Sequence, residues 1–556
     1  MKIKIIKYIS AFILGLLLFS CDKSFVDFQP LAQPSEITFY STMTCVDPAI
    51  TVCYANFSED KLWDLTITMT LGSISSDEAD AGGGGRDDVP EYQHVDQFTF
   101  SPSEANVFQW PWGYLYKTIN FCNIAIAKLP LINKSTDSTF DPVIIHKRLG
   151  EAHFLRALNY FTLNQIYGGV PVTDHVPLVS EYTKGRDDIS KSYDLIKADC
   201  HYAIDALPEK GGWGQDVGRA TKGAAQALLA KVFLYESSYA KYYPGDDRFK
   251  GMSQHWDSAL YYAQQVINSG KYQLVGSNGE RFKTYFPDSV GGYRYIFMAA
   301  ADNSPEGVFE IQNVADGLGW YSSRGESCSK WQAPRNIGGS GTTDGVGFGW
   351  GWEMPTRFLV SAYEPGDPRY KATVLLRADS VQTKTGWSHP NFNAIYANTG
   401  DSMYSKKYEA GSAEYWAKTG DYNSGPVDIK LIRYADVVLW AAEASFELGN
   451  NDASTGSLYY INLVRTRARM SGNTGAPANL VAITHDDIVH ERLVELACEG
   501  HRFFDLVRWN LANKYLNTTL MDGTPVTFIP IKNDFFPIPE REIGLSGNNL
   551  KQYPGW

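Results

Sequence analysis

The stretch HDDIVHERLVELACEGHRFFDLVRW, residues 485–509, decides how the rest of the chain is interpreted. Apolar residues recur in it at steps of three and four, which places them on one face of a helix. They are Ile488, Leu493, Leu496, Ala497, Phe504 and Val507. Thr484 is a suitable N-cap, and Asp486 and Asp487 follow in the first turn, where the helix dipole favours acids. The pattern predicts one long amphipathic helix over residues 485–509.

A charged stripe runs beside the apolar face of this predicted helix. Its members are Arg492, Glu495, Glu499, Arg502, Asp505 and Arg508. Glu495 and Glu499 are four residues apart, a spacing compatible with the paired carboxylates of a glycoside hydrolase. The alternative is a structural ladder of ion pairs, because arginines are interleaved at helical spacing and a compensated carboxylate is a poor proton donor. We favour the ladder.

The same stretch resembles a known family. The run from Glu491 to Trp509, which ends in EGHRFFDLVRW, is similar to the C-terminal signature of the SusD/RagB family. Three further segments are also similar to the family: EAHFLRALNYFTLNQIYGGVP from Glu151 to Pro171, residues 429–468, and the tail from Phe536 to Trp556. The resemblance covers essentially the mature chain and is weakest in the loops. It implies a surface lipoprotein of Gram-negative bacteria that captures nutrients.

The N-terminus has the pattern of a bacterial lipoprotein signal. Residues 2–7 include three lysines, and Ile9 to Phe19 is an apolar run too short to span a bilayer. Leu18, Ser20 and Cys21 form a lipobox, so cleavage would leave Cys21 as the acylated first residue. The alternative is an ordinary secretory signal followed by a chance cysteine. We predict a signal peptide over residues 1–20 and an outer-membrane, cell-surface lipid anchor at Cys21.

Composition narrows the classes of partner. The formal net charge of the 556-residue chain is −12 and becomes −15 without the three signal lysines, which argues against a nucleic-acid or anionic-membrane surface. Aromatic residues make up 14% of the chain, with 34 Tyr and 14 Trp. Such rings are suited to stacking on sugars, although core packing also accounts for many of them.

The seven cysteines show no CxxC spacing, so a metal or redox site is not expected. Cys45 and Cys53 are eight residues apart, and a disulfide between them is possible outside the cytoplasm. Cys122, Cys200 and Cys498 fall in helical patterns and are expected to be small buried hydrophobes.

The periodicity of the body predicts a mainly α protein. Helical patterns occupy residues 107–128, 148–167, 190–207 and 256–270, another opens at Arg219, and they resume at Ile429. Paired helices with alanine and aromatic residues at packing positions suggest tetratricopeptide-like hairpins, a fold that the family resemblance also implies. No strict repeat is visible.

Between Gly270 and Ile429 the helical period fails and Gly, Trp, Tyr and Ser dominate. A long irregular insertion usually carries function. The expected organisation is therefore a signal peptide (1–20), a lipidated tether (21–35), an N-terminal helical region (36–270), a ligand-facing, loop-rich insertion with little β-structure (271–428) and a C-terminal helical region (429–556).

Motifs of catalysis are absent from the sequence: there is no HExxH, GxSxG or GxxxxGK[ST]. The run Gly82 to Arg86 lacks the P-loop lysine and is expected to be a flexible loop. The histidines have no metal-ligand spacing. Asp77, Glu78 and Asp80 could bind Ca²⁺, but a solvated acidic loop is the favoured interpretation. No enzyme activity, cofactor or metal is expected.

Two irregular regions supply the candidate ligand-binding residues. Trp320, Tyr321 and Trp331 come from the insertion; Asp77, Arg86 and Tyr92 come from the earlier glycine-rich region. By resemblance, the family builds its site where two such regions meet. Gly317 and Gly319 let the backbone turn sharply beside Trp320 and Tyr321. The alternative is that these rings pack under their own loops. Trp350 and Trp352 are left out because they precede a stretch that looks like framework.

The favoured function is non-catalytic binding of an oligosaccharide or polysaccharide at the cell surface. By resemblance, the protein would deliver this glycan to a SusC-like TonB-dependent transporter in the outer membrane. A surface glycoside hydrolase remains an alternative, and so does a peptide-binding or purely structural lipoprotein of the same fold. No nucleic-acid partner is expected.

Overall fold

A computed structural model describes residues 39–57, 62–135, 137–283, 289–315, 324–333, 349–376, 379, 381–383, 386–388, 403–408, 425–472, 474–520 and 522–556. The predicted signal peptide, the tether and Cys21 lie outside these residues. Within them, no helix is both long and apolar enough to cross a membrane.

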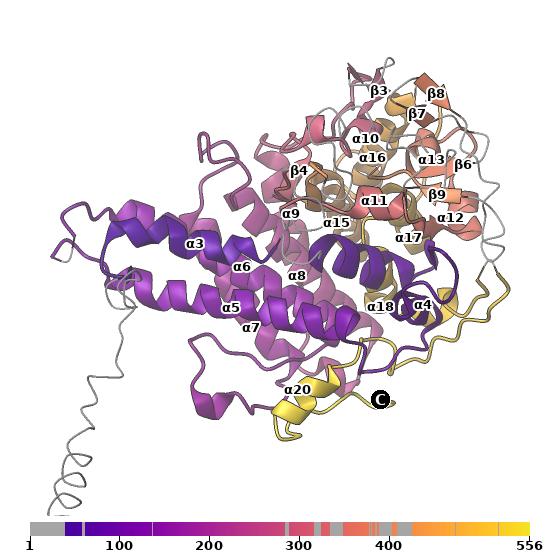
Figure 1. Ribbon diagram of the computed structural model, residues 1–556. Helices are drawn as coiled ribbons and strands as arrows, with labels where there is room; N and C mark the ends of the chain where they lie inside the picture. Colours follow the sequence, from indigo (N-terminus) through magenta and orange to yellow (C-terminus); the bar gives the residue numbers. More distant parts are fainter. Residues whose placement is uncertain are drawn as a thin grey trace, which may run out of the picture.

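The N-terminal part is built from helices, most of which pack on one another in sequence order (Figure 1). They are α3 (Val46–Ala55), α4 (Pro90–Gln97), α5 (Trp110–Lys128), α6 (Pro142–Tyr167), α7 (Ile189–Ala206), α8 (Lys222–Tyr242) and α9 (Trp256–Asn268). α5 packs on α6, α6 on α7, α7 on α8 and α8 on α9, while α3 lies against α5 and α6. This arrangement is the series of helical hairpins that the apolar periodicity predicts.

Local chemistry sets the ends of these helices. The Asp141 side chain accepts hydrogen bonds from the backbone N–H groups of Val143 and Ile144 and so caps α6. Gly168, with φ of 71°, ends the same helix, as the Gly-Gly-x-Pro sequence predicts. The Thr221 hydroxyl caps α8 by accepting from the N–H of Ala224. Short helical turns join or extend the longer helices: η2 (Met43–Cys45), η5 (Ala105–Gln109), η6 (Leu129–Leu131), η7 (Val179–Glu181), η8 (Asp247–Phe249) and η9 (Ala299–Ala301).

The C-terminal helices continue the stack. They are α15 (Tyr434–Glu447), α16 (Ser457–Gly472), α17 (His485–Leu496), α18 (Arg502–Arg508), α19 (Ala512–Tyr515) and α20 (Glu540–Leu545). α15 packs on both α9 and α16, so it joins the two halves of the helical region. The prediction that a helix resumes at Ile429 is wrong by five residues, because Ile429–Arg433 form strand β10, which pairs with β4 (Gly307–Ile311).

The single helix predicted over residues 485–509 is wrong: the chain breaks between α17 and α18. The capping box between Thr484 and Asp487 is present as predicted. After Leu496, however, Cys498 has φ of 57° and Gly500 has φ of 78°, both left-handed. A Cβ on Gly500 would lie 2.7 Å from the Cα of Thr68. The π-helical segment η4 (Leu62–Ile74) therefore approaches this turn backbone to backbone, which only a glycine allows.

The described part of the insertion contains only short elements. Its helices are α10 (Gly292–Tyr295), α11 (Cys328–Gln332), α12 (Arg357–Ala362) and α13 (Pro368–Thr373). Its strands, beside β4, are β2 (Arg281–Phe282), β3 (Val290–Gly291), β5 (Trp352–Pro355), β6 (Val374–Leu376), β7 (Val381–Thr383), β8 (Gly386–Ser388) and β9 (Met403–Ser405). Together with β1 (Ala79–Gly82), every described sheet has two antiparallel strands: β1–β5, β2–β3, β4–β10, β6–β9 and β7–β8. Little β-structure is what the sequence predicts.

The suggested disulfide between Cys45 and Cys53 is not formed. Both thiols are free and buried. Eight residues of continuous helix separate the two by about 12 Å, well beyond the roughly 7 Å that a disulfide spans between Cα atoms. Cys122, Cys200 and Cys498 are fully buried, as expected.

Candidate functional site

Four aromatic side chains from two distant parts of the chain meet in one group, here called the ring cluster. Its members are Tyr92, Trp331, Trp350 and Trp352. Tyr92 lies 5.7 Å from Trp331 and 5.3 Å from Trp352, measured between ring centroids. Trp331 lies 6.4 Å from Trp350 and 5.7 Å from Trp352. Tyr92 and Trp352 are buried, whereas Trp331 and Trp350 are half-buried and form the accessible side of the cluster.

The glycine-rich run positions the ring cluster. β1 pairs with β5, and the N–H of Gly83 donates to the carbonyl of Gly351 at 2.7 Å. A Cβ on Gly83 would lie 2.7 Å from the Trp352 ring, and Gly83 has a positive φ of 75°. The expected flexible loop is therefore a tight turn at Gly82 and Gly83 that carries the chain across an indole face. The Gln93 side chain ties this turn to α4 by donating to the carbonyl of Gly82 at 2.9 Å.

Of the six predicted ligand-binding residues, Tyr92 and Trp331 are brought together. They come from α4 and α11, which lie on the glycine-rich region and on the insertion respectively, so the two regions do meet. The indole Nε1 of Trp331 is buried and has no hydrogen-bond partner among the described residues. Trp320 and Tyr321 lie outside the described residues.

Asp77 and Arg86 are engaged elsewhere. The Asp77 side chain is buried, and each of its oxygens accepts from Arg502 at 2.7 Å. Arg86 is paired with Asp522 at the surface. Asp77 lines a cleft of about 320 Å³ between β1, α12 and residues 515–526. Glu78 is fully buried, which raises its pKa to about 8. The interpretation of Asp77 and Glu78 as part of a solvated acidic loop is therefore wrong, because both side chains lie in the interior.

Trp350 and Trp352 belong to the ring cluster although sequence reasoning assigned them to the framework. Trp352 is 1% exposed and is a core residue, as framework implies. Trp350 lies on the accessible side, beside Trp331. Trp350 precedes β5, and Gly351, with φ of 69°, separates the two tryptophans, so no strand periodicity in the sequence pointed to Trp350.

Glu495 and Glu499 sit in a buried ion network. Its basic members are Arg369, Lys407, Arg433, Arg465 and Arg467, and its acidic members are Glu306, Asp367, Glu491, Glu495 and Glu499. Glu495 accepts from Arg433 at 2.7 Å and from Arg369 at 3.0 Å, and it is also paired with Arg467. Glu499 accepts from Arg433 and is 2.9 Å from Lys407.

The electrostatics of this pair do not suit proton transfer. Burial alone would raise the pKa of Glu495, but Arg467, Arg433 and Arg369 outweigh it and hold the pKa below its ordinary value. Burial also opposes ionisation of Glu499, yet Arg433 and Lys407 lower its pKa to about 2. The structural interpretation is therefore supported, with one correction. The partners of Glu495 come from other elements: Arg369 from α13, Arg433 from β10 and Arg467 from α16.

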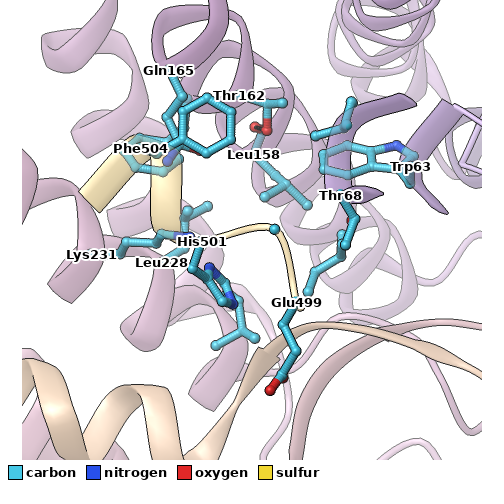
Figure 2. A pocket seen from close by; sticks show the side chains of 15 residues that line it. Trp63, Thr68, Leu158, Thr162, Gln165, Leu228, Lys231, Glu499, His501 and Phe504 are labelled. Atoms are coloured by element: carbon cyan, nitrogen blue, oxygen red, sulfur yellow. Dashed lines mark hydrogen bonds between the residues drawn. The ribbon is translucent and has the colours of Figure 1, made fainter. Parts of the chain in front are cut away.

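A small internal cavity lies against the turn between α17 and α18 (Figure 2). Its volume is about 50 Å³, which is room for a few atoms and far below the size of a ligand site. Lys231 and His501 face it from one side, and Trp63 and Thr68 from the other. Burial lowers the pKa of His501 to about 4, so this imidazole is neutral at physiological pH. The cavity is part of the interior.

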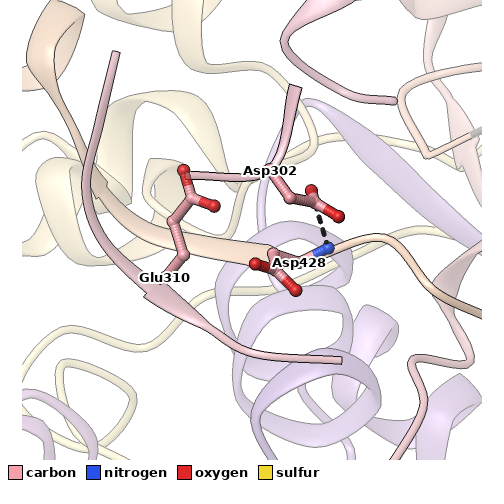
Figure 3. Close-up of side chains that lie close together, drawn as sticks. All are labelled: Asp302, Glu310 and Asp428. Carbon is pink, nitrogen blue, oxygen red and sulfur yellow. Dashed lines mark hydrogen bonds between the residues drawn. The ribbon is translucent and has the colours of Figure 1, made fainter. Parts of the chain in front are cut away.

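Three carboxylates, those of Asp302, Glu310 and Asp428, lie within 4.8 Å of one another (Figure 3). The backbone N–H of Asp428 donates to Asp302 at 3.1 Å. The Lys430 ammonium is 3.4 Å from Asp302 and 3.8 Å from Glu310, and it donates to the carbonyl of Asp428 at 3.2 Å. Burial raises the pKa of Asp302 to about 7 and that of Asp428 to about 8. The lysine supplies the positive charge that a metal would bring, so we interpret the group as structural.

A mainly α fold of stacked helical hairpins, with an aromatic site where an early glycine turn meets a late insertion, defines the class of protein. The protein-family model described as "SusD family" matches residues 354–556, and the family model described as "Starch-binding associating with outer membrane" matches residues 67–234. The chain belongs to the SusD/RagB family. Membership supports the prediction that the chain is not an enzyme.

Curated relatives span nearly the whole chain. A SusD-like protein of Formosa agariphila is 27% identical and covers 99% of this chain and 100% of the relative. A SusD-like protein of Bacteroides ovatus is 26% identical over 90% of this chain and 82% of its own. Among solved structures, a SusD homolog from Bacteroides thetaiotaomicron has a TM-score of 0.75 at 20% identity, covering 94% of this chain and 99% of its own. A laminarin-binding SusD-like protein has a TM-score of 0.71 at 24% identity, covering 93% and 100%. These structures confirm the fold.

Proposed function

We propose that the protein binds an oligosaccharide or polysaccharide at the cell surface without chemical turnover, and that the ring cluster is the core of its binding site. The observation that carries the proposal is the pair of half-buried indoles, Trp331 and Trp350, backed by Tyr92 and Trp352. Flat rings held from behind present a rigid apolar face, which suits the C–H face of a pyranose. The Nε1–H of Trp331 is buried without a hydrogen-bond partner among the described residues, so it can donate to a sugar hydroxyl if the ring becomes more exposed on binding.

The names of similar proteins agree with this proposal. One structural neighbour is described as a laminarin-binding protein and another as a surface glycan-binding protein in complex with laminarihexaose. A curated relative from Bacteroides thetaiotaomicron is named a starch-binding protein. These ligands differ in linkage, so they support the class of ligand and leave the particular glycan to experiment.

Trp320 and Tyr321 remain predicted members of the site, together with Asp77, Arg86 and Tyr92 in supporting places. Arg86 reaches the surface from the glycine turn, where its pairing with Asp522 holds the guanidinium in a fixed orientation. Asp77 acts indirectly, since its ion pair with Arg502 fixes the start of β1 against α18.

Delivery to a SusC-like TonB-dependent transporter completes the proposal. The lipobox at Cys21 would hold the mature chain on the outer membrane, and a family model that matches the chain carries the phrase "associating with outer membrane" in its description. A binding protein held beside its transporter raises the local concentration of nutrient at the entrance.

The test is a glycan array probed with the soluble chain that begins after Cys21, followed by calorimetry on the glycans that bind. Trp331→Ala and Trp320→Ala should each weaken binding by roughly 1–3 kcal/mol with little change in melting temperature. Tyr261→Ala removes an exposed ring from α9 and serves as the control. A large loss of thermal stability with unchanged affinity would assign the substituted indole to the core. Hydrolysis of any bound glycan would contradict the non-catalytic proposal.

A further inference from the structure

A second cavity, separate from the ring cluster, opens between α3, the loop at residues 215–219 and the end of β4. Its volume is about 680 Å³, within the roughly 300–1,000 Å³ of small-ligand sites. None of the residues that line it belongs to the ring cluster. The cavity is also distinct from the acidic group of Figure 3, although Glu310 belongs to that group and lines the cavity.

The cavity has an apolar floor and a polar rim. Phe57, Phe309 and Ile311 are buried and form the floor, where the Phe57 and Phe309 rings meet edge to face at 6.2 Å. Tyr54 is half-buried on the α3 side and lies 6.5 Å from Phe57. Exposed rim residues are Gln215, Asp216 and Gln312. An apolar floor with a few convergent polar groups is the usual composition of a binding pocket.

A buried carboxylate holds two polar groups of the wall in place. Glu151 is fully buried and accepts from the Tyr54 hydroxyl at 2.9 Å and from the Arg219 guanidinium at 3.0 Å. Arg219 is also 3.3 Å from Asp216, and its guanidinium lies 5.7 Å from the Trp213 ring centroid. These contacts fix Arg219 and Tyr54 before any ligand arrives, which lowers the entropy lost on binding.

The charge of the wall selects the class of ligand. Two arginines, Arg219 and Arg324, line the cavity together with the acids Asp216 and Glu310, and the buried Glu151 also pairs with Arg219. The wall therefore does not concentrate positive charge for a phosphate or sulfate. The wall offers neutral hydrogen-bonding groups instead, such as those of Gln215 and Gln312, beside the Tyr54 ring and the apolar floor. A neutral polyol with an apolar face, such as a hexose unit, matches that set.

We propose that this cavity is a second saccharide subsite that takes part of the same neutral glycan chain as the ring cluster. This inference rests on the proposed function. Val314 and Arg324 line the cavity and lie on either side of residues 316–323, which include the predicted ligand-binding residues Trp320 and Tyr321. The lining residue Arg324 therefore follows the segment of Trp320 in the sequence and precedes Trp331 by seven residues.

The test plugs the cavity from exposed positions, so that the fold is left intact. Val217 is 66% exposed at the mouth, and Ala55 is exposed at the end of α3. Val217→Trp and Ala55→Trp are titrated by calorimetry with laminarihexaose and with maltohexaose on the soluble chain. Val481→Trp, at a position 95% exposed and absent from the cavity lining, is the matched control.

We expect each plug to weaken hexasaccharide binding at least fivefold, while the control and the melting temperatures stay within error of the wild type. Plugged variants that bind as tightly as the wild type would overturn the subsite and leave the proposed function standing. Where the wild type binds neither hexasaccharide, the plugs are titrated with the glycans that bind on the array, and a wild-type chain that binds none of those would overturn both. Affinity lost in Trp331→Ala but unchanged by the plugs would assign all recognition to the ring cluster.

Discussion

At the scale of single residues, burial decides what each charge does. Glu495 is a surface ladder residue by sequence pattern, yet its side chain is completely buried between three arginines. A buried charge is tolerated only when it is paired, and removing one partner leaves the others uncompensated in a medium of low polarity. The same substitution therefore has a far larger effect here than on an exposed helix.

Glu495→Gln should lower the free energy of unfolding by about 3–5 kcal/mol, because Arg369, Arg433 and Arg467 lose their shared counter-charge. Denaturant titration followed by circular dichroism measures the change. Glu540→Gln, on the exposed start of α20, is the control and should shift stability by less than about 0.5 kcal/mol. A loss below about 1 kcal/mol for Glu495→Gln would return this residue to the surface-ladder interpretation.

The contributions of His501, Glu499 and Asp505 to the free energy of unfolding should fall as the pH drops from about 6.5 toward 2. Burial lowers the folded-state pKa of His501 to about 4, so the unfolded chain, with an ordinary value near 6.5, gains a proton first. Glu499 and Asp505 have folded pKa values of about 2, so their stabilisation is complete above their ordinary pKa and is lost below it.

This pH dependence is measured as the denaturant midpoint at each pH. Between pH 6.5 and 4, the wild type and His501→Gln should differ in pH dependence by up to about 3 kcal/mol, whereas the exposed His201→Gln should follow the wild type. Glu78 acts in the opposite direction: its pKa of about 8 makes its contribution fall as the pH rises from about 4 to 8. Profiles of the wild type and His501→Gln that run parallel between pH 6.5 and 4 would contradict the assignment of a neutral, buried imidazole.

At the scale of elements, the turn between α17 and α18 organises the centre of the molecule. It lets the backbone of η4 come close to Gly500, directs Glu499 into the buried ion network, and places Arg502 against Asp77 at the start of β1. Three segments far apart in the sequence thus depend on one left-handed residue.

Gly500→Ala should destabilise the protein by at least about 2 kcal/mol, because alanine is strained at a φ of 78° and its Cβ would lie 2.7 Å from the Thr68 Cα. Gly113→Ala is the control. A Cβ at position 113, inside α5, meets nothing within 4 Å, so this change should stabilise by about 0.5–1 kcal/mol. Equal melting temperatures for the two variants would show that η4 can retreat from the turn.

At the scale of the whole molecule, one continuous core joins the N-terminal hairpins to the C-terminal helices through α15 and β10. The ring cluster and the second cavity are built where the short elements of the insertion meet this helical body. The helical body holds these loops in place, and an anchor to the membrane at the N-terminus would leave the loops accessible to a ligand. The predicted lipid at Cys21 provides that attachment.

Cys21→Ser should move the protein from the membrane fraction to the soluble fraction, because several acyl chains give a stable anchor and no described helix replaces them. Fractionation and immunoblotting in a strain that lacks the proposed SusC-like transporter measure the effect. Asp22→Asn, next to the acylation site, is the control and should stay in the membrane fraction. A Cys21→Ser chain that still sediments with membranes in that strain would contradict the lipobox.

Sequence patterns alone were sufficient for the mainly α class, the principal helices of the N-terminal body and the cap at Thr484, and the family resemblance implied that the regions of Tyr92 and Trp331 meet. Helical period and capping act over a few residues, so they are legible without the fold. Tertiary structure alone decided that the helix breaks at Gly500, that Glu495 and Glu499 are buried, that Ile429–Arg433 extend as a strand and that Trp350 joins the ring cluster. Each of these depends on a partner from another segment: η4 for Gly500, Arg433 for Glu495 and Glu499, β4 for β10, and Trp331 for Trp350. The pattern of one segment carries no information about which distant backbone or charge will come to lie against it.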